Sequence, residues 1–253
     1  MAFRLGCAVW GYPGWVGSFF PEGTPQRDLL RLYARRFPTV EGNTVFYGVP
    51  TATTLQGWAR QTPESFRFCP KFPRDISHGG PLAPRAGDAL RLLDHLRENL
   101  GERLGPLFLQ LPPGYGPDEG PDLAVLLNEW RRAGNHPLLV EVRHPGWFAP
   151  PASDRLDTLL DRLGQGRVVL DTRPIYSGSD DPEDPDPQAD NERKKPNLPV
   201  SFRPVGSISL VRLICHPEPE RDLAYFEEWA ERVKDWLLAG REVYFFVLSL
   251  IHI

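Results

Sequence analysis

The sequence predicts a TIM-type barrel of eight parallel strands surrounded by helices. Short runs rich in Val, Leu and Phe alternate with longer segments of helical periodicity, an order that is typical of parallel sheets. Eight such runs occur in a chain of 253 residues, which matches the size of a β/α barrel. No G-x-G-x-x-G follows the first run, which argues against a doubly wound open sheet. We therefore expect residues 1–253 to form one domain.

Each expected strand is a short apolar run bounded by Gly, Pro or polar residues. In chain order the runs are 5–9, 39–43, 66–71, 106–111, 138–143, 167–171, 207–213 and 242–247. Helical spacing of leucines and aromatic residues predicts helices over 26–37, 88–101, 121–134, 154–164 and 223–240. All but the first of these helices end at a glycine, which favours termination.

Two parts of the chain depart from this order. Residues 173–204 form a long loop whose first half is acidic and rich in proline. Within it, residues 178–190 should be exposed and poorly packed, because they offer too little apolar surface to offset the entropy of ordering.

No helical pattern follows the eighth strand, so we expect a barrel that lacks its last helix, as a truncated gene product would. The outer faces of strands eight and one should then lie open and expose Val243 or Tyr244. On this expectation the chain is marginally stable or prone to aggregation, and the natural protein is about 25 residues longer.

Composition and charge exclude several classes of protein. No apolar run approaches the ~20 residues of a membrane helix, and the N-terminus has no signal-peptide pattern. The net charge is −4 and no basic stripe stands out, so nucleic-acid binding is not expected. The cysteines Cys7, Cys69 and Cys215 are odd in number and lie in strand-like runs, as reduced thiols do in a cytoplasmic protein.

Polar or aromatic residues occur at the end of seven consecutive expected strands, where the active site of a TIM barrel forms. They are Trp10, Tyr12, Glu41, Asn43, Tyr47, Lys71, Gln110, Glu141, Arg143, His144, Asp171, Arg212 and His216. Any one of them could form a satisfied ion pair or hydrogen bond in the core. Burying an unpaired polar or charged group is unfavourable, however, so chance does not readily explain why seven strands carry such groups at the same end. We expect a set of seven to converge at one barrel mouth: Glu41, Asn43, Lys71, Gln110, Glu141, Arg143 and Asp171.

This mixture of acids and bases predicts acid–base chemistry on a small polar or anionic molecule. The expected catalytic residues are Glu41, Glu141, His144 and Asp171, with Glu141 or Glu41 as the base. The expected substrate-binding residues are Trp10, Tyr12, Asn43, Tyr47, Lys71, Gln110, Arg143, Arg212 and His216. Among these, Lys71 and Arg143 should hold the anionic group. The alternative for the aromatic residues is a hydrophobic cluster.

Other classes of function stay open. Glu41, Glu141, His144 and Asp171 are also possible metal ligands, although nearby cations compete for the carboxylates, and we expect no metal. No cofactor is expected either. The chain has no nucleophile elbow, P-loop or H-E-x-x-H motif.

The alternatives to an enzyme of this kind are a noncatalytic small-ligand or protein-binding barrel and a nucleic-acid-processing or metal-dependent hydrolase. An enzyme requires a titrating group with a shifted pKa in a deep pocket, whereas a binding protein can have only Arg–Glu pairs and stacked aromatic rings. The pattern does not choose between hydrolysis, isomerisation and elimination.

A series of motifs resembles, in order, the pattern of the YecE-like family, domain of unknown function 72. They are GCAVWGYPGW (6–15), EGNTVFY (41–47), QLPP (110–113), EVRHPGW (141–147), LDTRP (170–174), KKPNLP (194–199) and VRLICHP (211–217). The resemblance covers nearly the whole chain and implies a TIM-type barrel. It implies no activity, because the family has no settled one.

Overall fold

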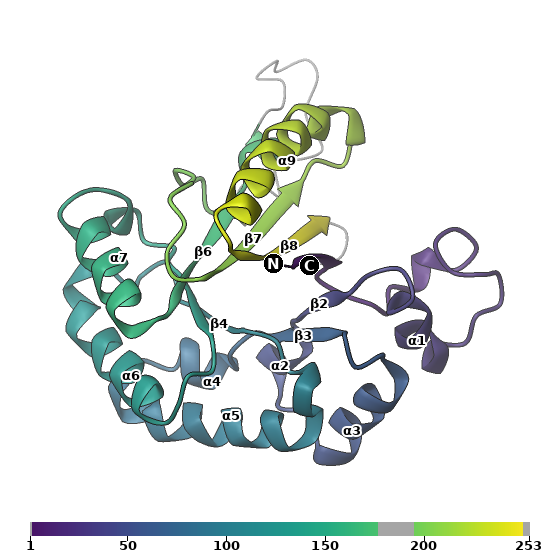
Figure 1. The fold of residues 1–253 in the computed structure, drawn as a ribbon, viewed down its shortest axis with the longest axis horizontal. Coiled ribbons are helices and arrows are strands. Elements are labelled where there is room, and N and C mark those ends of the chain that lie inside the picture. Colours follow the sequence, from purple (N-terminus) through teal and green to yellow (C-terminus); the bar gives the residue numbers. More distant parts are fainter. Residues whose placement is uncertain (1, 177–194, 250–253) are drawn as a thin grey trace.

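The computed structural model describes residues 2–176 and 195–249, and the predicted exposed stretch 178–190 lies outside them. Eight parallel strands form one sheet in the order β3-β2-β1-β8-β7-β6-β5-β4 (Figure 1). They are β1 (Phe3–Cys7), β2 (Thr39–Gly42), β3 (Arg67–Pro70), β4 (Leu107–Gln110), β5 (Leu138–Glu141), β6 (Gly166–Asp171), β7 (Ile208–Cys215) and β8 (Glu242–Ser249). The predicted barrel is therefore confirmed, and every predicted strand boundary lies within two residues of the observed one.

The barrel closes between β3 and β4 through single bridges instead of a continuous ladder. Phe68 bridges Leu104, and Lys71 bridges Phe108. The N–H of Phe72 also donates to the carbonyl of Phe108 at 3.0 Å. These contacts fix the backbone at the C-terminal end of β3, where Lys71 begins the loop at the barrel mouth.

Helices cover the outside of the strands (Figure 1). They are α1 (Leu29–Tyr33), α2 (Thr44–Tyr47), α3 (Ala52–Gln61), α4 (Arg74–Ser77), α5 (Ala86–Leu100), α6 (Gly120–Arg132), α7 (Ala152–Leu163) and α9 (Leu223–Leu238). The sequence pattern did not predict α3, in which Leu55 is the one buried residue. Its N-terminus is nevertheless capped by Thr51, whose hydroxyl accepts from the N–H of Thr54 at 3.3 Å.

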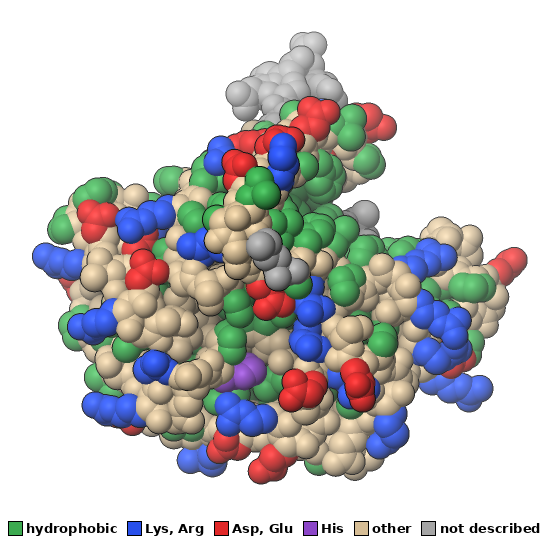
Figure 2. All heavy atoms as spheres, in the orientation of Figure 1, with side chains coloured by type: hydrophobic (Ala, Val, Ile, Leu, Met, Phe, Trp, Pro, Cys, Tyr) green, Lys and Arg blue, Asp and Glu red, His purple; other side chains and the backbone are tan. Residues whose placement is uncertain are grey.

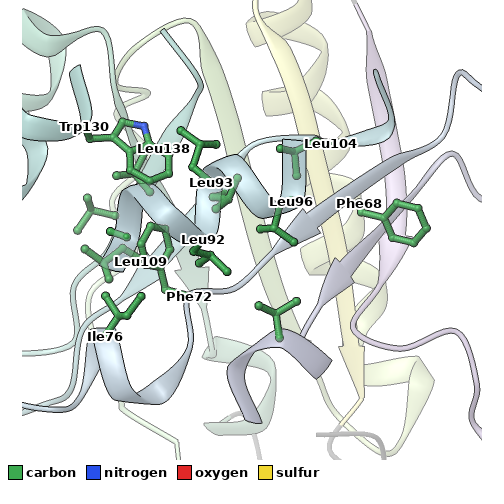
Figure 3. Packing of buried hydrophobic residues seen from close by; sticks show 14 of the residues in the cluster. Phe68, Phe72, Ile76, Leu92, Leu93, Leu96, Leu104, Leu109, Trp130 and Leu138 are labelled. Atoms are coloured by element: carbon green, nitrogen blue, oxygen red, sulfur yellow. The ribbon is translucent and has the colours of Figure 1, made fainter. Parts of the chain in front are cut away.

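Two hydrophobic layers follow from the alternation of side chains along each strand. Outward-facing residues pack against the helices, and Figure 3 shows one part of this layer, where Phe72 and Trp130 lie among leucines of α5. Inward-facing residues such as Phe108, Leu210 and Phe246 fill the barrel. Arg212, between Leu210 and Ile214 on β7, therefore points into the barrel interior.

The outer face beside α9 differs from the prediction. Val243 and Tyr244 are 0% and 2% exposed, so the expectation that they lie open is wrong. Val243 belongs to the cluster under α9, whereas Tyr244 belongs to the cluster that fills the barrel.

An apolar groove of about 520 Å³ does lie between α9 and the neighbouring strands β1 and β8. Its lining includes Phe3, Leu5, Phe226, Phe245 and Val247, and Figure 2 shows hydrophobic side chains gathered beside α9. No helix within residues 2–176 and 195–249 is both long and apolar enough to cross a membrane.

Candidate functional site

Arg212 is the centre of an ion-pair network inside the barrel. Its Nε and Nη2 donate to the two carboxylate oxygens of Glu41 at 2.7 and 2.8 Å. Its Nη1 donates to Glu141 Oε2 at 2.6 Å. All three residues are almost completely buried, so each charge depends on the others for compensation. The network occupies the layer of inward-facing side chains just below the barrel mouth.

A chain of hydrogen bonds continues from this network to Lys71. Gln110 Nε2 donates to Glu141 Oε1 at 2.7 Å, and Lys71 Nζ donates to Gln110 Oε1 at 2.6 Å. Arg143 Nε donates to the same oxygen of Glu141 at 2.8 Å. The Nζ of Lys71 also lies 3.6 Å from the ring centroid of Phe46, so one side of the ammonium group contacts an aromatic face.

A cavity of about 520 Å³ opens above this network at the C-terminal end of the strands. Its lining is Val9, Asn43, Thr44, Phe46, Tyr47, Lys71, His78, Gln110, Arg143, Lys195, Arg212 and Ile214. Four of these residues are lysine or arginine and, among the described lining residues, none is acidic. Glu41 and Glu141 neutralise part of this charge from below without reaching the cavity wall. The cavity is therefore suited to an anion.

The charges in the network shift the pKa of several groups. Burial opposes ionisation of Glu141, but the guanidinium groups of Arg212 and Arg143 outweigh it and lower its pKa to about 2. Burial, and then the charge of Arg212, lower the pKa of Lys71 from 10.5 to about 7. Burial also lowers the pKa of His78 to about 4. At neutral pH Glu141 is thus a carboxylate, His78 is neutral, and Lys71 exchanges its proton readily.

Six of the seven residues expected to converge do lie at this mouth, and Asp171 does not. Asp171 follows outward-facing Val169 by two positions and therefore faces the helices. Its Oδ2 accepts from Trp229 Nε1 of α9 at 2.9 Å and from Arg173 Nη2 at 2.8 Å. The expectation that Asp171 joins the mouth is wrong, because the strand register turns it to the other face.

Two further expected residues, His144 and His216, are not among the cavity lining. His144 is the N-cap of the 3₁₀ turn Pro145–Phe148, and its Nδ1 accepts from the N–H of Gly146 at 3.1 Å. His216 is buried in the turn after β7, where its Nδ1 accepts from the N–H of Glu218 at 2.9 Å. These contacts give both rings a role in shaping loops.

The expected aromatic residues divide between the rim and the core. Tyr47 lines the cavity and is 83% exposed. Trp10 and Tyr12 instead line a neighbouring hollow of about 350 Å³, which shares Asn43 with the main cavity. The ring of Trp10 packs edge-on against Trp58 at 4.9 Å, as the alternative of a hydrophobic cluster predicts.

Sequence reasoning missed His78 and Lys195, which both line the cavity. His78 comes from the loop after β3, a position from which TIM barrels recruit functional groups, and its Nδ1 lies 2.8 Å from Ser77 Oγ. Lys195 belongs to the KKPNLP motif (194–199), which carried the family resemblance but was not read as part of a site. Among the described residues, no three His, Cys, Asp or Glu side chains cluster as metal ligands would.

Several known proteins are similar to this chain in sequence or in structure. The chain is 33% identical to the UPF0759 protein YecE of Escherichia coli (strain K12) over 235 residues, 92% of this chain and 81% of YecE. It is 27% identical to the UPF0759 protein YunF of Bacillus subtilis (strain 168) over 184 residues, 67% of this chain and 62% of YunF. A crystal structure of a DUF72 family protein from Thermotoga maritima superimposes with a TM-score of 0.70 at 19% identity, covering 98% of this chain and 92% of that one.

A second solved structure, a DUF72 family protein from Enterococcus faecalis, has a TM-score of 0.68 at 17% identity and covers 97% of this chain and 88% of that one. These two structural likenesses concern the fold alone. The model of the family described as protein of unknown function DUF72 matches residues 4–249. With that match extending from β1 to the end of β8, the chain belongs to the DUF72 family.

Proposed function

We propose that the protein is an enzyme that uses acid–base chemistry on a small anionic molecule bound at the barrel mouth. The observation that carries this proposal is the lining of the cavity, which has four lysine or arginine residues and, within the described part of the chain, no acidic one. Two buried glutamates offset only part of that charge. An anionic substrate supplies the missing negative charge and forms charge-assisted hydrogen bonds with the cations.

Arg143 and Lys195 are the groups that hold the anion. Within residues 2–176 and 195–249, the guanidinium group of Arg143 makes one ion pair, to Glu141 through Nε. Its two terminal nitrogens are therefore available to a ligand in the cavity that Arg143 lines. A planar guanidinium can bind a carboxylate or phosphate through two parallel hydrogen bonds.

Lys71 is the group that transfers a proton in this proposal. A general acid or base works best when its pKa lies near the operating pH, and Lys71, with a pKa of about 7, meets that condition. Glu141 meets it less well than the sequence suggested, because its pKa is about 2 and both its oxygens already accept hydrogen bonds. The glutamates instead position Arg212 and Gln110.

The same observations favour an enzyme over a noncatalytic binding barrel. A binding protein needs only satisfied ion pairs, such as those between Arg212 and the glutamates. A buried amine with a strongly lowered pKa at the floor of an anion-binding cavity adds nothing to affinity, because its neutral form attracts an anion less. Such groups are typical of active sites. The three cysteines are free thiols, which fits a reaction in the reducing cytoplasm.

The test is to identify the molecule that copurifies with the protein. We expect untargeted mass spectrometry of the released metabolites to find a small anion with the wild type that is absent from Arg143→Met. Arg131→Met, on the exposed end of α6, is the matched control and should retain it. Recovery of no enriched anion would contradict the proposal. Recovery of an anion that the wild type leaves unchanged would support the noncatalytic binding barrel instead.

A further inference from the structure

We propose that Lys71 is a nucleophile and that the cavity takes small aldehydes or ketones bearing a carboxylate or phosphate, which Lys71 binds as a Schiff base. This inference rests on the proposed function, because it uses the same cavity and the same anion-binding side chains. It goes further by assigning a covalent step and a substrate class.

The position of the amine suits such a step. Lys71 is 8% exposed and lies at the closing seam of the barrel, where its backbone bridges Phe108. Its Nζ is held by Gln110 Oε1 at 2.6 Å and by the Phe46 ring at 3.6 Å. A fixed amine at the floor of a cavity presents its lone pair in a defined direction, which favours attack on a bound carbonyl group.

The choice of lysine at this position is informative. The chain has 29 basic residues but only four lysines, at positions 71, 194, 195 and 234. At the same barrel mouth, Arg143 and Arg212 show that arginine is used where only a positive charge is needed. Arginine stays protonated, whereas a buried lysine can lose its proton and attack a carbon. A lysine at this position therefore supplies an amine as well as a cation.

The covalent step balances within the site. The neutral amine of Lys71 adds to the carbonyl carbon, and the π electrons move to the oxygen, which takes a proton. A proton then leaves nitrogen, a further proton adds to the hydroxyl group, and the C–O bond breaks to release water. The product is a cationic iminium, so the net reaction consumes one carbonyl group and one proton and yields the iminium and one water.

Neighbouring groups support each stage. Burial, and then the charges of Arg212 and Arg143, favour the neutral amine of Lys71, and they outweigh the opposite effect of Glu141 and Glu41. Neutral His78 lines the same cavity and can accept a hydrogen bond from the nitrogen while the proton passes to solvent. The face of the Phe46 ring stabilises the iminium cation, while Arg143 and Lys195 hold the anionic group of the substrate.

Reductive trapping tests the inference. The full chain is incubated at pH 7.5 with glyoxylate or with dihydroxyacetone phosphate and sodium cyanoborohydride, and modified peptides are mapped by mass spectrometry. The two probes distinguish a carboxylate from a phosphate substrate. We expect a roughly tenfold or greater excess of adduct at Lys71 over Lys234, because Glu231 raises the pKa of Lys234 and keeps that amine protonated. Lys71→Arg should abolish this adduct, and Lys234→Arg, on α9, should retain it.

Binding of lactate and glycerol 3-phosphate, which carry the same anionic groups without a carbonyl, separates this inference from the proposed function. If calorimetry shows that they bind while no adduct forms at Lys71, the Schiff-base inference is overturned and the anion site stands. If they do not bind and no adduct forms, both fail. Equal labelling of all four lysines also overturns the inference. Because peptide mapping of the wild type gives this answer, the test does not depend on the folding of Lys71→Arg.

Discussion

Arg212 binds both oxygens of Glu41, through Nε at 2.7 Å and Nη2 at 2.8 Å, in an interior where both side chains are at most 4% exposed. The two residues are 171 positions apart, so this ion pair joins β2 to β7 across the barrel. The same guanidinium pairs with Glu141 of β5. One arginine thus ties three strands together at the level of the site.

Replacing Arg212 by methionine should destabilise the protein by about 3–5 kcal/mol, because two buried carboxylates lose their partner. Urea unfolding measures this change. Arg91→Met is the matched control, since Arg91 pairs with Asp88 on the exposed face of α5, and such pairs contribute less than about 1 kcal/mol. A loss for Arg212→Met no larger than that of the control would show that the network does not hold the strands.

The lowered pKa of Glu141 predicts a dependence of stability on pH. Its pKa is about 2 in the folded state against 4.5 ordinarily, so its contribution is fully present above about pH 4.5 and is lost as the pH falls towards 2. Glu141→Gln should therefore be less stable than the wild type by about 3 kcal/mol at pH 6, and the difference should narrow between pH 4.5 and 2.5.

The measurement for Glu141 is the free energy of unfolding at several pH values, with Glu102→Gln as the control for loss of an exposed carboxylate. A constant difference between wild type and Glu141→Gln across this range would mean that the ion pairs do not set the ionisation of Glu141.

Asp171 should affect stability and not ligand binding. Its carboxylate accepts from Trp229 Nε1 and Arg173 on the helix-facing side of β6. Asp171→Asn should lower the free energy of unfolding by about 1–3 kcal/mol. The affinity for the copurifying anion, measured by calorimetry, should stay within error of the wild type. A large loss of affinity without a loss of stability would show that Asp171 takes part in ligand binding after all.

The apolar groove beside α9 should bind hydrophobic dyes and promote aggregation. Phe3 and Phe226 line it and are 46% and 37% exposed. The double variant Phe3→Ser with Phe226→Ser should reduce both dye fluorescence and the rate of aggregation. Val125→Ser, which removes an apolar residue 45% exposed on α6, is the control. The same reduction in the control would argue against a specific role for the groove.

Strand positions and the polar layer could be predicted because two periodicities are legible in the sequence. Glu41 and Asn43, or Glu141 and Arg143, stand two apart in otherwise apolar runs, so they must share one face of a strand. The run that ends at Asp171 has apolar residues on both faces of the strand, as parallel strands often do. Its register could not be determined from the pattern, and the aspartate was assigned to the wrong face.

Other parts of the site depend on tertiary structure that a linear pattern does not contain. His78 and Lys195 reach the cavity from loops, where no periodicity indicates direction. The pairing of Arg212 with two glutamates from distant strands depends on the closed barrel. The expectation that Glu141 or Glu41 is the base could therefore not be weighed against these ion pairs. The lowered pKa of Lys71 likewise depends on how deeply the folded chain buries it.

The proton affinity of Lys71 is the most direct test of the account, and the chain suits it because it contains only four lysines. Selective ¹³C labelling of lysine side chains and NMR titration would follow each of them, with Lys71→Arg assigning the signal. We predict that the Lys71 signal titrates near pH 7, whereas Lys234 stays protonated at that pH because Glu231 raises its pKa. A Lys71 signal that remains constant from pH 6 to pH 9 would show that the amine stays charged, and would contradict its role in proton transfer.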